Sequence, residues 1–436
     1  MAEDRFGTIN QGIKDEELEA YKKKLDQAVK ILSDSFIGKI LYKQNKDGSY
    51  KYDADGNIEE RTTITDISFD GYNCYVQDNL IDRYRLNDPE KDPRIKEGLP
   101  KLNVSVKDVD TLGKAISNFM NKTWTTTDPI LDVEIGNLRT NFINQTVSSY
   151  GTSFAIRVSR ASLAIKDLTK LADEETAKLL DICMKCKFNT MISGETGSGK
   201  TEFQKALVGF IPGRMKITLL EDTKDSHIKE IYPDKDINSW VTVKDASKES
   251  GYAVSFADLI RAGLRNNPDW LMISETRGSE ANDVISAALT DHSIMTTLHA
   301  TGAANIPSRL ADMIATYNPN MNYNALQLNI LSVINIGIHM ERVVDPNTGF
   351  NVRRIREIFE YVDYKEGAGV IGYPLYQVKE TYNPETDHYE TTVTKARMSD
   401  KLLDRVKYAH LFKELPDIFK LGAYEHETFY DRKNKG

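Results

Sequence analysis

The chain has 436 residues, of which 40% are hydrophobic and 28% charged, a composition typical of a soluble globular protein. Its 65 acidic and 57 basic side chains give a net charge of −8, which disfavours non-specific binding to a polyanion, so we expect no direct nucleic-acid readout. Three cysteines are too few for a disulfide framework and indicate a reducing compartment. Two of them, Cys183 and Cys186, are three residues apart in a predicted helix, where packing is favoured over a zinc site.

Residues 1–60 are predicted to form an N-terminal extension. Apolar residues recur at helical spacing over about 15–41, which predicts an amphipathic helix that packs on its own domain, with a partner-binding helix as the alternative. Residues 46–60 are polar and contain two Asp-Gly steps, a pattern typical of a hairpin or loop.

Residues 61–160 are predicted to form an α+β domain. Strand patterns are found at 63–69 and 73–77, a helical pattern at 107–121, and alternating runs at 131–147 and 153–159. Residues 161–172 are interpreted as a linker.

Residues 173–372 alternate between strand and helix patterns after a first helix at 173–186. Such alternation predicts an α/β fold with a mostly parallel sheet covered on both faces. The predicted strands are 188–193, 215–221, 270–275, 294–299, 335–341 and 352–362, and the predicted helices are 200–209, 256–265, 280–289, 303–315 and 324–333. Residues 373–436 are predicted to be a C-terminal extension with two strands and a helix near 400–413.

Residues 194–201 read G-x-x-x-x-G-K-T between a predicted strand and a predicted helix, the context in which this motif binds phosphate. Glycines let the backbone approach a phosphate closely, and the helix N-terminus favours an anion. Lys200 is predicted to reach the β- and γ-phosphates of ATP, and Thr201 to ligate Mg²⁺. The predicted nucleotide-binding residues are Gly194, Thr196, Gly197, Ser198, Gly199, Lys200 and Thr201.

Hydrolysis also requires a carboxylate that orients water and one that helps to hold Mg²⁺. Glu275 and Glu221 each end a hydrophobic strand, where parallel sheets carry catalytic groups, and either is a candidate general base. Glu275 is also a candidate Mg²⁺ ligand. We expect the strand of Glu221 to lie between the phosphate loop and Glu275, which is the arrangement of RecA-like ATPases rather than nucleoside kinases.

His299 ends a third strand, and its position favours a coupling role over a structural one. Four arginines cluster around this region of the sequence, and most are expected to be ion-paired while one or two stabilise transition-state charge: Arg261, Arg265, Arg277 and Arg309.

Residues 262–280 and 296–301 resemble the Walker B and His boxes of the type II/type IV secretion ATPase superfamily, and Glu221-Asp222 resembles its aspartate box. The resemblance extends over about 60–362 and includes 64–71, 136–139 and 155–157 in the N-terminal domain. The resemblance is closest to the conjugation/type IV secretion and Tad-pilus branch. The tetracysteine zinc motif is not found, which argues against the type II secretion and pilus-extension branch.

The resemblance implies a RecA-like P-loop domain after a smaller N-terminal domain, and a homo-hexamer that couples ATP hydrolysis to secretion or conjugative transfer. It implies that Arg139 and Arg157 reach the phosphates when the domains close. It also implies membrane-embedded partners and a peripheral position at the cytoplasmic face of the membrane. Two features depart from the family pattern: Ser274 replaces a usual glycine, and residues 141–151 lack a common proline pair.

Three other functions remain open from the residues: a Tad or type IV pilus assembly ATPase, a RecA-like nucleic-acid translocase, and a nucleotide-gated scaffold that does not hydrolyse. The acidic balance disfavours the translocase, and the presence of both Glu221 and Glu275 disfavours the scaffold. The sequence does not identify the transported substrate.

Overall fold

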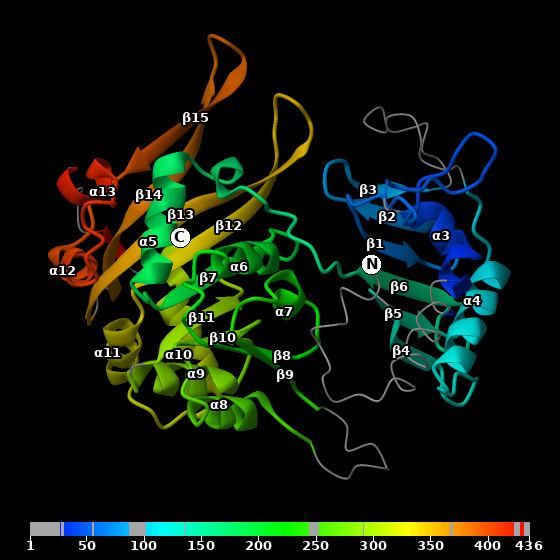
Figure 1. Cartoon of the computed structure of the whole chain (residues 1–436), viewed down its shortest axis with the longest axis horizontal. Coiled ribbons are helices and arrows are strands. Elements are labelled where there is room, and N and C mark those ends of the chain that lie inside the picture. The colour runs from blue at the N-terminus through cyan, green and yellow to red at the C-terminus, as the bar shows by residue number, and fades with distance from the viewer. Residues whose placement is uncertain are drawn as a thin grey trace. The chain divides into compact units, whose positions relative to one another are not determined.

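The computed structural model describes residues 27, 30–54, 56–86, 102–135, 137–243, 253–290, 292–366, 369–422 and 428–430. The chain divides into two compact units, residues 1–160 and 161–436, and each is described by itself (Figure 1). Most of the helix predicted over 15–41 lies outside the described residues. No helix within the described ranges is both long enough and apolar enough to cross a bilayer.

The first unit is an antiparallel sheet with strand order β3-β2-β1-β6-β5-β4. The sheet buries alternate residues, as in β4, because one face packs against the helices and the other does not. Ser105 and Asp108 form a capping box that begins α4. The elements are α3 (Phe36–Leu41), β1 (Ile64–Phe69), β2 (Cys74–Asp78), β3 (Asp82–Arg85), α4 (Val106–Phe119), β4 (Ile130–Ile135), β5 (Leu138–Ile143) and β6 (Ser153–Val158).

The described end of the N-terminal extension packs into the core of this unit. Ile37 and Ile40 of α3 belong to the same hydrophobic cluster as Ile67 of β1 and Ile116 of α4. The predicted hairpin chemistry at 46–60 is confirmed by isolated bridges that join Gln44 to Tyr50 and Tyr52 to Ile58.

The second unit is built on a ten-stranded sheet with strand order β15-β14-β13-β12-β7-β11-β10-β8-β9, and β16 pairs with β14. The six strands from β12 to β9 are parallel, and β13, β14 and β15 continue the sheet in antiparallel fashion. The strands are β7 (Thr190–Gly194), β8 (Ile217–Glu221), β9 (Ile237–Val241), β10 (Trp270–Ile273), β11 (Ser293–Leu298), β12 (Ile336–Val344), β13 (Asn351–Lys365), β14 (Gly369–Asn383), β15 (His388–Lys395) and β16 (Thr428–Tyr430). The helices are η2 (Leu168–Lys170), α5 (Glu174–Lys185), α6 (Lys200–Val208), α7 (Ile228–Ile231), α8 (Phe256–Leu264), α9 (Glu280–Leu289), η3 (Ala303–Asn305), α10 (Ile306–Tyr317), α11 (Tyr323–Val333), α12 (Asp400–Tyr408) and α13 (Asp417–Leu421).

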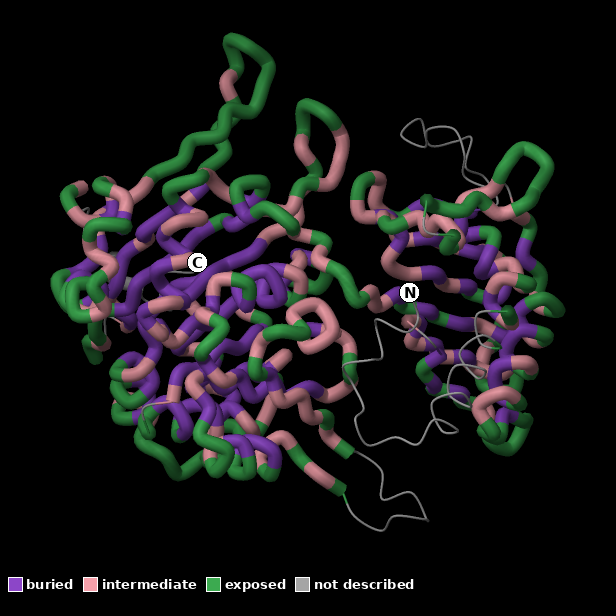
Figure 2. The backbone as a smooth tube through the Cα atoms, viewed as in Figure 1, coloured by how far each residue is buried: buried purple, intermediate pink, exposed green. Residues whose placement is uncertain are grey.

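Helices cover both faces of this sheet, so the predicted α/β class is confirmed. Trp270 and Met272 of β10 pack in one hydrophobic cluster with α5, α6 and α12. Leu271 and Ile273 pack in the other cluster with α8, α9, α10 and α11. Figure 2 shows the resulting buried interior, whereas the far ends of the β12–β13 and β14–β15 hairpins are exposed.

Three features differ from the expectations or were not foreseen. The strand between β7 and β10 is β11, which carries His299 at its end; the prediction that the strand of Glu221 lies there is wrong. The short α7 and β9 were not predicted. The boundary predicted between residues 372 and 373 lies inside β14, which pairs with β13, so the sheet continues into the predicted C-terminal extension.

Cys183 of α5 and Cys186 at its C-cap are both free thiols buried in the core, in agreement with a packing role.

Candidate active site

The phosphate-binding motif forms a loop between the end of β7 and the start of α6. Gly194 has φ of 153°, and a Cβ there would lie 2.3 Å from the carbonyl oxygen of Met340 on β12. Gly199 has φ of 93° at the N-cap of α6, and its position offers no side-chain cap. The first N–H groups of a helix lack partners within the helix, so α6 presents donors to an anion at this point.

Lys200 is buried at the first position of α6. Its Nζ donates to the carbonyl oxygens of Gly194 at 2.8 Å and Glu195 at 2.9 Å, which folds the side chain back over the loop. Burial lowers the pKa of Lys200, and the carboxylates of Glu275 and Glu195 oppose that shift. Lys200 is therefore within electrostatic reach of Glu275, as the predicted site requires.

The remaining loop residues divide by exposure. Thr196, Gly197 and Thr201 are exposed, whereas Ser198 is buried and donates through Oγ to the carbonyl oxygen of Glu195 at 2.8 Å. Thr201 is thus an exposed residue next to Lys200, while Ser198 stabilises the shape of the loop.

Glu275 follows β10 and lies between two other side chains. Its Oε2 accepts from Arg277 at 2.6 Å, and its Oε1 lies 3.2 Å from Nε2 of His299. Burial raises the pKa of Glu275, but the hydrogen bond from Arg277 and the charges of Arg277, His299 and Lys200 outweigh it, so the pKa lies below its usual range. Glu275 is consequently ionised at neutral pH.

Glu221 lies apart from the phosphate loop, at the end of β8. It is buried at the end of β8, where Oε1 accepts from the backbone N–H of Ser226 at 3.0 Å and Oε2 lies 3.5 Å from the hydroxyl of Ser239 on β9. Burial raises its pKa, and the hydrogen bonds from Ser226 oppose the shift. The sheet places β8 three strands from β7, so the structure does not bring Glu221 together with Lys200 as it does Glu275.

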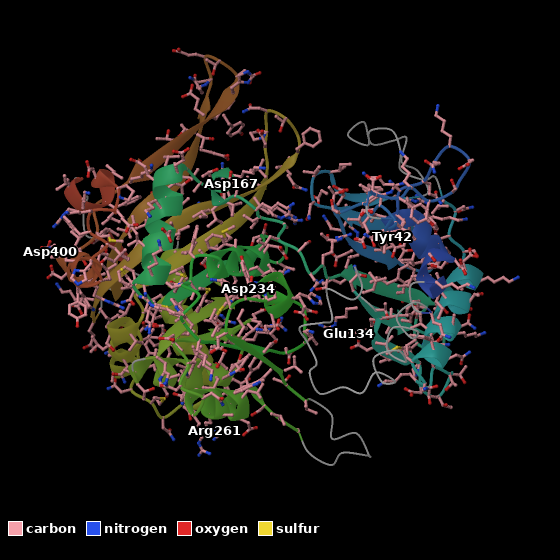
Figure 3. All side chains as sticks on the ribbon, viewed as in Figure 1. Tyr42, Glu134, Asp167, Asp234, Arg261 and Asp400 are labelled. Atoms are coloured by element: carbon pink, nitrogen blue, oxygen red, sulfur yellow. The ribbon has the colours of Figure 1, made fainter. Side chains whose placement is uncertain are left out.

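Asp222, next to Glu221, acts electrostatically on Arg277. The hydrogen bond with Glu275, assisted by the charges of Glu275, Asp222 and Glu280, raises the pKa of the Arg277 guanidinium. Arg277 is thus the arginine of the 261–309 set that contacts the site. Arg261 pairs with Asp258 at the exposed start of α8, and Figure 3 shows it pointing away from the unit.

Arg139 and Arg157 lie in the first unit, directly opposite each other on β5 and β6. Nε of Arg157 lies 3.3 Å from Oδ1 of Asp66 on β1. Asp66 lies 91 residues before Arg157 in the sequence, and Glu134 of β4 stands directly opposite Arg139 in the sheet register. Gly136, part of the motif that singled out Arg139, lies outside the described residues.

Three residues beside the phosphate loop were missed by the sequence analysis, and all come from β12 and β13. Arg353 donates through Nε to the carbonyl oxygen of Gly197 at 2.9 Å, and Nε of Arg342 lies 4.0 Å from Oε1 of Glu195. Nδ1 of His339 lies 2.9 Å from the hydroxyl of Ser193. The local sequence gave no signal for them, because their closeness to the loop arises from the pairing of β12 with β7.

The site fits Mg²⁺ bound together with a nucleotide. Among the described residues, no group of three His, Cys, Asp or Glu side chains forms a metal cage. Mg²⁺ is commonly held by one or two protein groups together with phosphate oxygens, and the exposed hydroxyl of Thr201 and the ionised Glu275 suit that mode. The site therefore combines the loop and N-terminus of α6, which favour an anion, with the buried Lys200 and the ionised Glu275.

Comparisons with known proteins identify the family of this chain. The family described as "Type II/IV secretion system protein" matches residues 128–347. A protein of Bacillus anthracis described as uncharacterised is 28% identical over 362 residues, which cover 82% of this chain and 76% of that protein. The type IV secretion system protein PtlH of Bordetella pertussis is 34% identical over 157 residues, or 35% of this chain and 44% of PtlH, so the alignment spans less than half of that relative. Among solved structures, the ATPase DotB of Yersinia pseudotuberculosis aligns with 14% identity and a TM-score of 0.48 over 70% of this chain and 76% of that chain.

Proposed function

Because the chain belongs to the type II/IV secretion system protein family, we propose that it is an ATP hydrolase that drives transfer through a type IV secretion-like machine. The observation that carries the proposal is the joint placement of Lys200 and Glu275 at one end of the parallel sheet. The name of PtlH supports a secretion machine over a pilus.

The geometry supports a role for each residue of the site. The loop and the start of α6 would bind the phosphates, Lys200 would contact the β- and γ-phosphates, and Thr201 with Glu275 would hold Mg²⁺, which would supply positive charge to the phosphates. Glu275 orients the attacking water, and His299 and Arg277 hold Glu275 in place. Of the two candidate general bases, Glu275 is favoured because it acts electrostatically on Lys200, whereas Glu221 ends β8, three strands from β7.

The core is RecA-like in this proposal. The order β12-β7-β11-β10-β8 places one strand between the phosphate-loop strand and the strand of Glu275, which supports a RecA-like fold over that of a nucleoside kinase. We further propose an N-terminal domain over 61–160, an ATPase domain that begins near residue 173, and nucleotide contact by Arg139 and Arg157.

The proposed assembly is a homo-hexamer at the cytoplasmic face of a membrane, bound to membrane-embedded components of the machine. The family resemblance supports it. Light scattering with a slowly hydrolysed ATP analogue tests the ring, and a monomer with full ATP turnover would contradict it.

Substitution of Lys200 tests the enzymatic assignment. Lys200→Ala is expected to abolish ATP turnover with little change in melting temperature, because the Nζ contacts only carbonyl oxygens of its own loop. The matched control is Arg261→Ala, which removes an exposed, ion-paired cation from α8 of the same unit. Turnover by Lys200→Ala within a few-fold of the wild type would refute the assignment, as would an equal loss in the control.

A further inference from the structure

Two side chains of β13 hold the backbone of Ala303, four residues after His299. The backbone N–H of Ala303 donates to Oε1 of Glu357 at 2.5 Å, and its carbonyl oxygen accepts from the hydroxyl of Tyr361 at 2.6 Å. All three residues are buried. Both backbone groups of one loop residue are therefore bound by a single strand.

Glu357 takes the place of a local helix cap. Ala303 begins η3, and Gly302 at the N-cap has no side chain to accept the first N–H. Such N-terminal groups need a partner when they are buried. A carboxylate that accepts from a backbone N–H makes a charge-assisted bond, stronger than one between neutral groups.

The surrounding backbone leaves room for this arrangement. A Cβ on Gly337 of β12 would lie 1.9 Å from the hydroxyl of Tyr361, and a Cβ on Gly302 would lie 3.0 Å from Oε1 of Glu357. Side chains at these two positions would displace the groups that hold Ala303.

The loop from His299 to Ala303 is thus fixed at both ends. Leu298 is buried in β11 before it, and Glu357 with Tyr361 binds the other end. The His299 side chain itself is 45% exposed, so its position depends on the backbone of this loop more than on packing around the ring.

We propose that Glu357 is a positioning residue that holds the 299–303 loop so that His299 meets Glu275. The proposal rests on the proposed ATP hydrolysis at this site and adds a residue from a strand that does not itself touch the phosphate-loop strand. A displacement of about 1 Å in a catalytic group can reduce the rate by roughly 10²-fold, so this anchor controls kcat rather than nucleotide affinity.

Glu360 supplies a matched control on the same strand. It is a second buried glutamate of β13, and its Oε2 accepts from the backbone N–H of Ser399 at 2.9 Å, at the start of α12. Loss of either carboxylate leaves a buried N–H without its acceptor, but only Glu357 binds the loop of His299.

The experiment compares Glu357→Ala, Glu357→Gln and Glu360→Ala by kcat per folded molecule and by the dissociation constant of a fluorescent ATP analogue. Glu357→Ala is expected to lower kcat by roughly 10- to 100-fold with unchanged nucleotide affinity. Glu357→Gln is expected to retain turnover because its amide oxygen still accepts from Ala303. Glu360→Ala is expected to lower the melting temperature and retain kcat. An unchanged kcat in Glu357→Ala, or an equal loss in Glu360→Ala, overturns the proposal.

Two further measurements keep the test decisive. Tyr361→Phe removes only the hydroxyl bond to Ala303 and serves if Glu357→Ala does not fold; a kcat equal to that of the wild type then overturns the proposal. In a His299→Ala background, Glu357→Ala is expected to have little added effect, since both act on one contact. Fully additive losses of kcat in the double variant would contradict the positioning role of Glu357.

Hydrogen exchange separates the positioning role of Glu357 from the proposed ATP hydrolysis. The peptide that contains Ala303 is expected to exchange faster in Glu357→Ala and not in Glu360→Ala, and this readout does not depend on turnover. Unchanged exchange overturns the positioning role, whereas a wild-type protein without ATP turnover contradicts the proposed function alone.

Discussion

His339 joins β12 to the last residues of β7 before the phosphate loop. Its Nδ1 lies 2.9 Å from the hydroxyl of Ser193, and the ring is buried. Burial, together with the positive charges of Arg356 and Lys200, lowers the pKa of His339 from 6.5 to about 4. The ring is therefore neutral in the folded protein at neutral pH.

This shift predicts a pH dependence of stability. Because the pKa of His339 is lower in the folded than in the unfolded state, the unfolded chain binds more protons between pH 6.5 and about 4. His339 therefore destabilises the fold increasingly as the pH falls through that window, with a slope of up to about 1.4 kcal/mol per pH unit. His339→Gln keeps a polar partner for Ser193 without titrating. Urea unfolding from pH 7 to pH 4.5 is expected to show a shallower pH slope for the variant, and identical slopes would contradict the assignment.

The sequence identified those site residues that lie in continuous motifs. The loop from Gly194 to Thr201 and the strand ends at Glu275 and His299 are local patterns, and the structure brings Lys200, Glu275 and His299 together. Arg353, His339 and Glu357 were not identified, because each contacts a segment more than 50 residues away through strand pairing.

At the scale of elements, the close approach of β12 and β13 to the site depends on Gly337. An alanine Cβ there would overlap the Tyr361 hydroxyl and lie 3.0 Å from Cδ1 of Ile306. Gly337→Ala is expected to lower the free energy of unfolding by about 1–3 kcal/mol, because the core cannot absorb an extra methyl without moving Tyr361. Gly213→Ala is the control, since no atom lies within 4 Å of its added Cβ. Chemical denaturation measures both, and equal stability of the two variants would show that the β12–β13 contact is more adaptable than the structure indicates.

Periodicity predicted the central elements well and their order less well. The helix predicted at 256–265 is observed as Phe256–Leu264, and the strand at 294–299 as Ser293–Leu298. Sequence patterns specify which segments are buried on both faces, but not which parallel strand lies next to which. For that reason the sequence placed the strand of Glu221 between β7 and β10, whereas the structure has β11 there.

At the scale of the whole molecule, Arg139 and Arg157 are the residues of the first unit that we propose to contact the nucleotide. Like charges directly opposite on adjacent strands destabilise a sheet, and Asp66 offsets this at Arg157. An exposed ion pair contributes only about 0–1 kcal/mol to stability, whereas an arginine that stabilises phosphoryl transfer contributes roughly 10³–10⁵-fold in rate.

Arg139→Ala and Arg157→Ala are therefore expected to lower kcat steeply with little change in melting temperature. Arg83→Ala, which removes an exposed arginine from β3 of the same sheet, is the control and is expected to keep both values. Steady-state turnover and thermal unfolding decide between the roles. Normal ATP hydrolysis by both variants would show that neither arginine acts on the nucleotide, and the domain arrangement inferred from the family would lose its support.

The most direct test of ATP hydrolysis at this site is the parallel measurement of ATP binding and phosphate release by Glu275→Gln. The amide keeps the size of the side chain and can still accept from Arg277, but it loses the negative charge that we propose to orient water. The account predicts ATP affinity like that of the wild type and phosphate release slower by roughly 10²–10⁴-fold. Phosphate release by Glu275→Gln at the wild-type rate would contradict the account.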